Sequence, residues 1–260
     1  AMALVDEMVL VNTDEVCSAI KAIYEDTRSI MEPAGALAVA GMIKYVREKN
    51  LSKLRLVAIN SGANMNFDRL QFVAERSLIG EKHEALFAVK IHEGGGSLRK
   101  FCREVVGHRN ITEFNYRLSH RKDAFIFVGI GIRSEQEEAA FRKLMLEKGY
   151  DNVDLTDNEL AKTHIRHMVG GRTRLTEREL LFNFRFPEYP GALDHFLAAM
   201  EADWNISLFH YRSTGGDFGR VLVGLEIPEA DNSKLKRFLR ELDYSYTEET
   251  DNEAYRLFLK

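Results

Sequence analysis

The spacing of apolar and polar positions predicts a regular unit in the middle of the chain. Apolar residues alternate with polar ones over residues 84–92, and the glycines at 94–96 interrupt them. The elements predicted after this strand are a helix over 98–106, strands over 111–118 and 124–132, a helix over 135–148 and a short strand from 153. The order β-α-β-β-α-β predicts a ferredoxin-like fold.

The same unit occurs a second time, displaced by 95 residues. Residues 110–117 read NITEFNYR and residues 205–212 read NISLFHYR. Between residues 84 and 129 the same displacement aligns many further identical residues, so the two segments are copies of one unit. The second copy predicts strands over 179–186, 206–213, 219–227 and 244–249, helices over 191–203 and 232–242, and turns at 187–190 and at Gly215-Gly216. A helix over 157–168 is expected between the copies, and a strand over 254–259 after them.

The first part of the chain, residues 1–78, follows another pattern. The elements predicted there are strands over 8–11 and 54–59, helices over 14–25 and 34–48, and a tight loop over 61–64. These elements are typical of part of an α/β domain, and both strands would lack sheet neighbours. We therefore predict an α+β chain of three parts, with boundaries at 1–78, 79–169 and 170–260.

Composition narrows the class of protein. The formal net charge is −4 with acids and bases interleaved, which favours neither a nucleic-acid nor a membrane partner. Two cysteines, Cys17 and Cys102, are too few for a disulfide framework, and we expect buried free thiols in a cytoplasmic protein. His164 and His167 have a spacing that can bind a metal, but no acidic or cysteine partner accompanies them, so no metal site is expected.

Several motifs resemble one enzyme family along nearly the whole chain. EPAGALAVAG (32–41) and NSGANMNF (60–67) are similar to the closing motifs of the catalytic domain of threonine ammonia-lyases, pyridoxal-phosphate enzymes of the tryptophan-synthase-β-like fold. HMVGGR (167–172), FPEYPGAL (186–193) and the NITEFNYR pair resemble the regulatory half of the biosynthetic, isoleucine-sensitive form. The resemblance implies that the two copies are ACT-like domains and that residues 1–78 are the end of a catalytic domain.

The resemblance also implies a reaction and its cofactor. The family converts threonine to 2-oxobutanoate and ammonia in isoleucine biosynthesis, with pyridoxal phosphate as the electron sink. The family's Schiff-base lysine and phosphate loop precede position 1 of this chain, so we expect no catalytic residue, no bound cofactor and no turnover here. Ser61 is the one cofactor contact implied, because the family's serine faces the pyridine nitrogen; the alternative is that it shapes a turn.

An effector site is expected in the two copies. Helix starts at Gly96 and Gly191 suit a carboxylate, and Asn110 and Asn205 offer donors and acceptors. The resemblance implies that the effector-sensing region also includes Tyr116, Arg117, Tyr211 and Arg212. Alternatively, the tyrosines are strand aromatics paired across the sheet.

The implied effectors are isoleucine, which inhibits, and valine, which opposes it. The implied assembly is a homo-oligomer, either a dimer or a tetramer. A stand-alone amino-acid-binding module remains the alternative reading of the chain.

Overall fold

The computed structural model describes residues 4–119, 122–176, 178–201, 204–213 and 218–260. The chain divides into two compact units, Ala1–Glu84 and Ala85–Lys260. The turn predicted at Gly215-Gly216 lies outside the described residues.

The first unit is built on three helices, α1 (Thr13–Thr27), α2 (Pro33–Glu48) and α3 (Arg69–Gly80). Asn12 begins α1 with a capping box that it shares with Glu15, which satisfies backbone groups that the first turn would leave unpaired. The small core of the unit comes from all three helices and includes Ile20, Ala36 and Val73. The two helices predicted from the sequence are confirmed, whereas α3 was not predicted.

Two predicted strands of this unit are wrong. Residues 8–11 and 54–59 run without regular secondary structure, and Met8 and Val57 are 80% and 92% exposed. A strand is stabilised by the backbone hydrogen bonds of its neighbours. Within the described residues no strand pairs with either segment. Most of their apolar side chains therefore stay exposed, although Val11 packs against the core of the unit.

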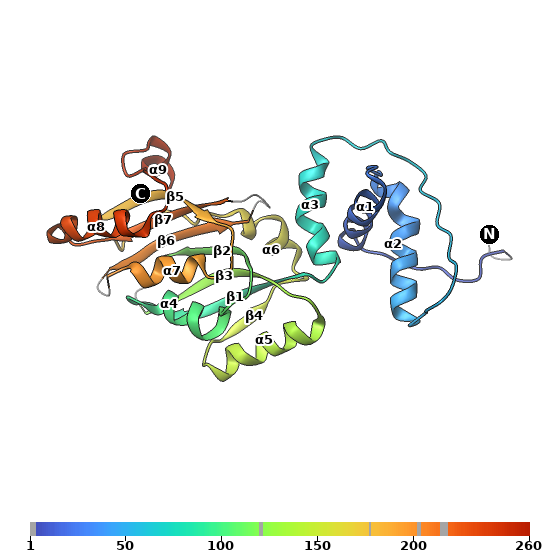
Figure 1. The fold of residues 1–260 in the computed structure, drawn as a ribbon, viewed down its shortest axis with the longest axis horizontal. Helices are drawn as coiled ribbons and strands as arrows, with labels where there is room; N and C mark the ends of the chain where they lie inside the picture. Colours follow the sequence, from blue (N-terminus) through green and yellow to red (C-terminus); the bar gives the residue numbers. More distant parts are fainter. Residues whose placement is uncertain (1–3, 120–121, 177, 202–203, 214–217) are drawn as a thin grey trace. The chain divides into compact units, whose positions relative to one another are not determined.

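The second unit contains one eight-stranded sheet in the order β4-β1-β3-β2-β6-β7-β5-β8 (Figure 1). The strands of the first repeat are β1 (Glu84–His92), β2 (Ile111–Arg117), β3 (Asp123–Gly131) and β4 (Asn152–Asp154). Those of the second are β5 (Glu179–Pro187), β6 (Asn205–Arg212), β7 (Phe218–Glu226) and β8 (Tyr246–Glu248). The predicted order of strands and helices is confirmed in both repeats, and the sheet order of the second repeat mirrors that of the first.

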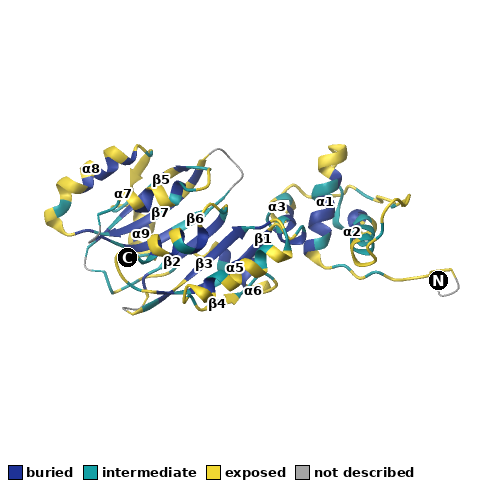
Figure 2. Ribbon diagram, turned by 60° about the horizontal axis from the view of Figure 1, so that its bottom comes forward, coloured by how far each residue is buried: buried dark blue, intermediate teal, exposed yellow. Residues whose placement is uncertain are grey.

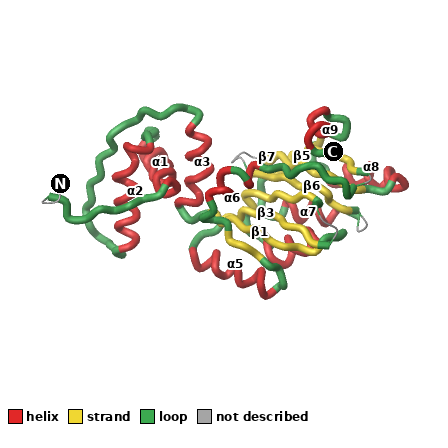
Figure 3. The backbone as a smooth tube through the Cα atoms, turned by 180° about the vertical axis from the view of Figure 1, so that it is seen from behind, coloured by secondary structure: helices red, strands yellow, loops and turns green. Residues whose placement is uncertain are grey.

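The repeats join edge to edge through β2 and β6, which pair antiparallel. Asn115 lies opposite His210, its own equivalent in the second repeat, so an approximate twofold axis passes between these two residues. The strands of both repeats consequently run side by side as one continuous sheet (Figure 3).

Helices of both repeats cover one face of this sheet. They are α4 (Ser97–Phe101), its π-helical continuation η1 (Cys102–Val106), α5 (Glu135–Glu147), α7 (Ala192–Ala199) and α8 (Asn232–Leu242). Aromatic side chains fill the space between helices and strands, as where Phe87 meets Phe141 at 5.5 Å and Phe184 meets Phe196 at 5.3 Å between ring centroids. The strands between the two edges of the sheet are largely buried, while α5 and α8 expose their outer sides (Figure 2).

Short helices lie on the opposite face. The predicted helix over 157–168 is shorter than expected and is divided into α6 (Glu159–Thr163) and the 3-10 turn η2 (Ile165–His167). The strand predicted over 254–259 is wrong, because this segment forms the helix α9 (Glu253–Phe258). Tyr255 of α9 packs on Leu181 and Leu208, so packing on this face of the sheet stabilises the helix.

Two features expected from the composition can be compared with the structure. Cys17 and Cys102 are both buried free thiols, as predicted. Among the helices of the described residues, none combines the length and the apolar character needed to cross a bilayer.

Candidate ligand-binding site

Two pockets lie between the repeats at positions related by the displacement of 95 residues. The Tyr116 pocket is lined by Ile91–Arg99 and Tyr116 of the first repeat and by residues of the segment 197–206 of the second. The Tyr211 pocket is lined by Phe186–Asp194 and Tyr211 of the second repeat and by residues of the segment 102–111 of the first. The cavity volumes are about 170 and 50 Å³ respectively.

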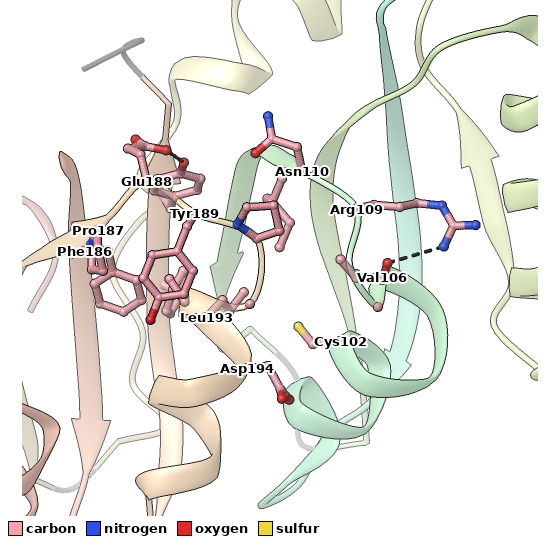
Figure 4. Close-up of a pocket in the computed structure, with 17 residues that line it drawn as sticks. Cys102, Val106, Arg109, Asn110, Phe186, Pro187, Glu188, Tyr189, Leu193 and Asp194 are labelled. Atoms are coloured by element: carbon pink, nitrogen blue, oxygen red, sulfur yellow. Dashed lines mark hydrogen bonds between the residues drawn. The ribbon is translucent and has the colours of Figure 1, made fainter. Parts of the chain in front are cut away.

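Each pocket takes its predicted residues from both repeats. Gly96 and Tyr116 share a pocket with Asn205, and Gly191 and Tyr211 share one with Asn110. Figure 4 shows Asn110 of the first repeat facing Glu188 and Tyr189 of the second. Because the strands that carry the two tyrosines pair with each other, each repeat completes the pocket of the other.

The tyrosines reach the pockets because successive residues of a strand point to opposite faces. Phe114 and Tyr116 belong to the core on the helix-covered face, and Tyr116 is only 4% exposed. Its hydroxyl donates to Glu93 over 2.6 Å, and the hydroxyl of Tyr211 donates to Glu188 over 2.6 Å. Burial and these carboxylates raise the pKa of both tyrosines above the usual range, so both remain protonated donors at neutral pH.

The two predicted glycines begin helices with a backbone that side chains disfavour. Gly96 precedes α4 with φ of 81°, and Gly191 precedes α7 with φ of 100°. Both values lie in the left-handed region, where a Cβ atom is strained, which explains glycine at both positions.

Of the predicted asparagines, Asn110 immediately precedes β2 and Asn205 is the first residue of β6, and each lines a pocket. Asn205 donates from Nδ2 to Glu226 Oε2 over 3.0 Å. The backbone carbonyl of Asn110 accepts from the amide of Gly131 over 2.8 Å, and Asn110 lines the Tyr211 pocket.

The two predicted arginines line neither pocket. Arg117 pairs with Glu179 and donates to the Leu259 carbonyl over 2.6 Å. Arg212 Nε lies 3.2 Å from Glu113 Oε1. Both arginines therefore lie on the face of α6 and α9, opposite the pockets, because each follows a pocket tyrosine by one position on its strand.

Glu93 and Glu188 are pocket residues that the sequence reasoning missed. Each accepts the hydroxyl of the tyrosine in its pocket. They are related by the same displacement of 95 residues that links the tyrosines. Searching the repeat for matching charged residues would have found them.

Ser61 lies in the first unit, in a loop held against the start of α2. The amide of Glu32 donates to the Gly62 carbonyl over 3.1 Å, and a Cβ on Gly35 would stand 2.6 Å from the same oxygen. Ser61 itself is exposed. One neutral hydroxyl does not hold a charged cofactor, so the residues present here do not by themselves fit pyridoxal phosphate.

Two lysines of this unit, Lys21 and Lys44, are in ion pairs. Lys21 lies 2.6 Å from Glu81, and Lys44 lies 3.2 Å from Glu15. Both are therefore held as structural cations in this unit.

The fold and the paired pockets define a tandem of ACT-like regulatory domains. The chain belongs to the family of C-terminal regulatory domains of threonine dehydratase, whose model matches residues 75–165 and 170–259.

Curated relatives agree with this family. The chain is similar to biosynthetic L-threonine dehydratases of Burkholderia multivorans (54% identity over 98% of this chain and 50% of that relative) and Escherichia coli (48%, 98% and 49%). It is also similar to the mitochondrial threonine dehydratase of Saccharomyces cerevisiae (44% identity, 100% of this chain and 47% of that relative). The chain thus spans about half the length of the curated relatives it matches.

Proposed function

We propose that this chain is the effector-sensing half of a biosynthetic threonine dehydratase. The whole enzyme is a pyridoxal-phosphate lyase of the cytoplasm that converts L-threonine to 2-oxobutanoate and ammonia in isoleucine biosynthesis. Isoleucine inhibits it and valine opposes that inhibition. The observation that carries the proposal is the pair of pockets, each assembled from both repeats around the tyrosine, glycine and asparagine that the repeat pattern singles out.

The chemistry of the Tyr116 pocket suits a free branched-chain amino acid. Its apolar lining is suited to an aliphatic side chain and comprises Ile91, Leu98, Leu197, Met200 and Ile206. The helix start at Gly96 offers backbone groups to the ligand carboxylate, and Asn205 offers an amide at the rim.

A ligand that touches both repeats can act as a regulator. Because each pocket is completed by the other repeat, ligand affinity depends on how the repeats are arranged. Any effect on threonine affinity equals the differential affinity of the effector for two states of the enzyme.

The remaining parts of the chain have proposed roles in the whole enzyme. Residues 1–78 close the catalytic domain, and Ser61 faces the pyridine nitrogen of the cofactor when the other half of the enzyme is present. Residues 79–169 and 170–260 form the two sensors. The enzyme is a homo-oligomer, and this chain alone has no turnover.

The proposal is tested by calorimetric titration of the chain with isoleucine, valine and threonine. Tyr116→Phe and Tyr211→Phe remove the hydroxyl that anchors a pocket glutamate, and Tyr24→Phe is the control on an exposed tyrosine of the first unit. We expect saturable isoleucine binding that at least one pocket variant weakens about tenfold, while Tyr24→Phe leaves it unchanged. A folded wild-type chain that binds none of the three would refute the proposal.

A further inference from the structure

Each pocket contains a buried carboxylate oxygen for which the described residues provide no hydrogen-bond partner. In the Tyr116 pocket this atom is Oε2 of Glu93, and in the Tyr211 pocket it is Oε1 of Glu188. The other oxygen of each carboxylate accepts the tyrosine hydroxyl over 2.6 Å. Buried polar atoms are nearly always paired, so two orphan oxygens at equivalent positions indicate a missing partner.

The same glutamate–tyrosine pair occurs in both pockets, although the residues around the two glutamates differ. Arg99 of the Tyr116 pocket corresponds to Asp194 of the Tyr211 pocket, and Trp204 corresponds to Arg109. The glutamate and its tyrosine are the same in both repeats. A pair that stays constant while its neighbours change in size and charge indicates a shared role in recognition more than a shared packing need.

The electrostatics of Glu93 favour a cationic partner. Burial raises the pKa of this carboxyl above its ordinary value, while the Tyr116 hydroxyl and the nearby Asn205 amide lower it in part. The Asn205 amide makes its short bond, 3.0 Å, to Glu226 and so leaves Glu93 incompletely satisfied. A cation that enters the pocket would favour the ionised carboxylate and supply the missing donor.

Resting on the proposed function, we propose that Glu93 and Glu188 receive the α-ammonium group of the amino acid that enters each pocket. An ammonium group carries three donors, of which one satisfies the orphan oxygen. The tyrosine hydroxyl holds the carboxylate in place.

This assignment defines the ligand class of both pockets. A 2-oxo acid or a 2-hydroxy acid has the same carboxylate and side chain as the amino acid but carries no cation, so it would leave the carboxylate without its counter-charge. The pockets therefore select amino acids against their deaminated counterparts, which include the class of product that the proposed reaction releases.

The test uses the 260-residue chain and a ligand pair that differs only in the ammonium group: isoleucine and 2-hydroxy-3-methylpentanoate. Glu93→Gln and Glu188→Gln keep an acceptor for the tyrosine hydroxyl but remove the negative charge. Glu147→Gln makes the same change on the exposed side of α5, outside both pockets.

In the wild-type chain and in Glu147→Gln we expect isoleucine to bind roughly ten- to hundredfold more tightly than the hydroxy acid. Each pocket variant should lose this preference at one site, and the double variant at both. If wild type binds isoleucine and the variants keep the preference, the ammonium assignment is overturned and the proposed function stands. If the wild-type chain binds neither ligand, both the ammonium assignment and the proposed function are overturned.

A pH titration of the wild-type chain gives a second readout that needs no variant. The charged and titratable groups around Glu93 are His92, Arg99, Tyr116, Glu201 and Glu226. Isoleucine should bind more tightly at about pH 7.5 than at about pH 5, because the acceptor must be ionised, whereas the hydroxy acid should gain nothing. Equal pH dependence for the two ligands would contradict the assignment.

Discussion

Neighbouring side chains of β2 point to opposite faces of the sheet. Tyr116 faces the pocket, and the next side chain, Arg117, enters a buried polar network with Glu179. The Arg117 side chain is 8% exposed and the Glu179 side chain is 3% exposed. Ser207 and Tyr255 also donate to Glu179, so its carboxylate is satisfied by three different elements. The network ties the C-terminal helix α9 to the sheet.

Replacing Arg117 with methionine should destabilise the second unit strongly. The change would remove the cation from a buried carboxylate, which costs about 3–5 kcal/mol when one partner of a buried pair is lost. Urea unfolding measures the loss. Arg142→Met is the control, because Arg142 is half-exposed at 3.6 Å from Asp154 and should contribute less than about 1 kcal/mol. Equal losses for the two variants would contradict the role given to Arg117.

At the scale of elements, the seam between β2 and β6 holds the two repeats together. At its centre, His210 Nδ1 lies 2.7 Å from Asn115 Oδ1. Burial lowers the pKa of His210 below its ordinary value of 6.5, and the charges of Arg212 and His167 lower it further. The folded protein therefore favours the neutral imidazole.

This seam should make the second unit sensitive to acid. Since the pKa of His210 is depressed on folding, its contribution to stability is present above the unfolded pKa and is lost as the pH falls through the folded pKa. We expect the melting temperature of wild type to fall between about pH 7 and pH 5 more steeply than that of His210→Gln. Thermal unfolding followed by circular dichroism measures both curves, and parallel curves would contradict the prediction.

The elements differ in how well the sequence predicted them. The strands and helices of the repeats were predictable because each pattern occurs twice and is packed within its own repeat. The strands expected over 8–11 and 54–59 were wrong because a strand depends on neighbours that periodicity does not specify. The strand expected over 254–259 could have been predicted as a helix from the repeat. The equivalent residues of the first repeat, 95 positions earlier, lie in the predicted helix over 157–168.

At the scale of the whole molecule, the pockets depend on how the repeats join. Each repeat has two edge strands, and the sequence does not specify which edges meet. The residue types in the pockets were predictable, as Gly96, Asn205 and Tyr116 show. Their combination across repeats follows only from the pairing of β2 with β6, whereas the exclusion of Arg117 and Arg212 follows from the alternation of side chains along each strand.

The central claim is that the two inter-repeat pockets are amino-acid sites. The most direct test is a crystal structure of the chain soaked or grown with saturating isoleucine. The account predicts electron density for isoleucine between Gly96, Tyr116 and Asn205, with its ammonium group on Glu93. Isoleucine bound elsewhere on the chain, with the Tyr116 pocket filled only by solvent, would contradict the account.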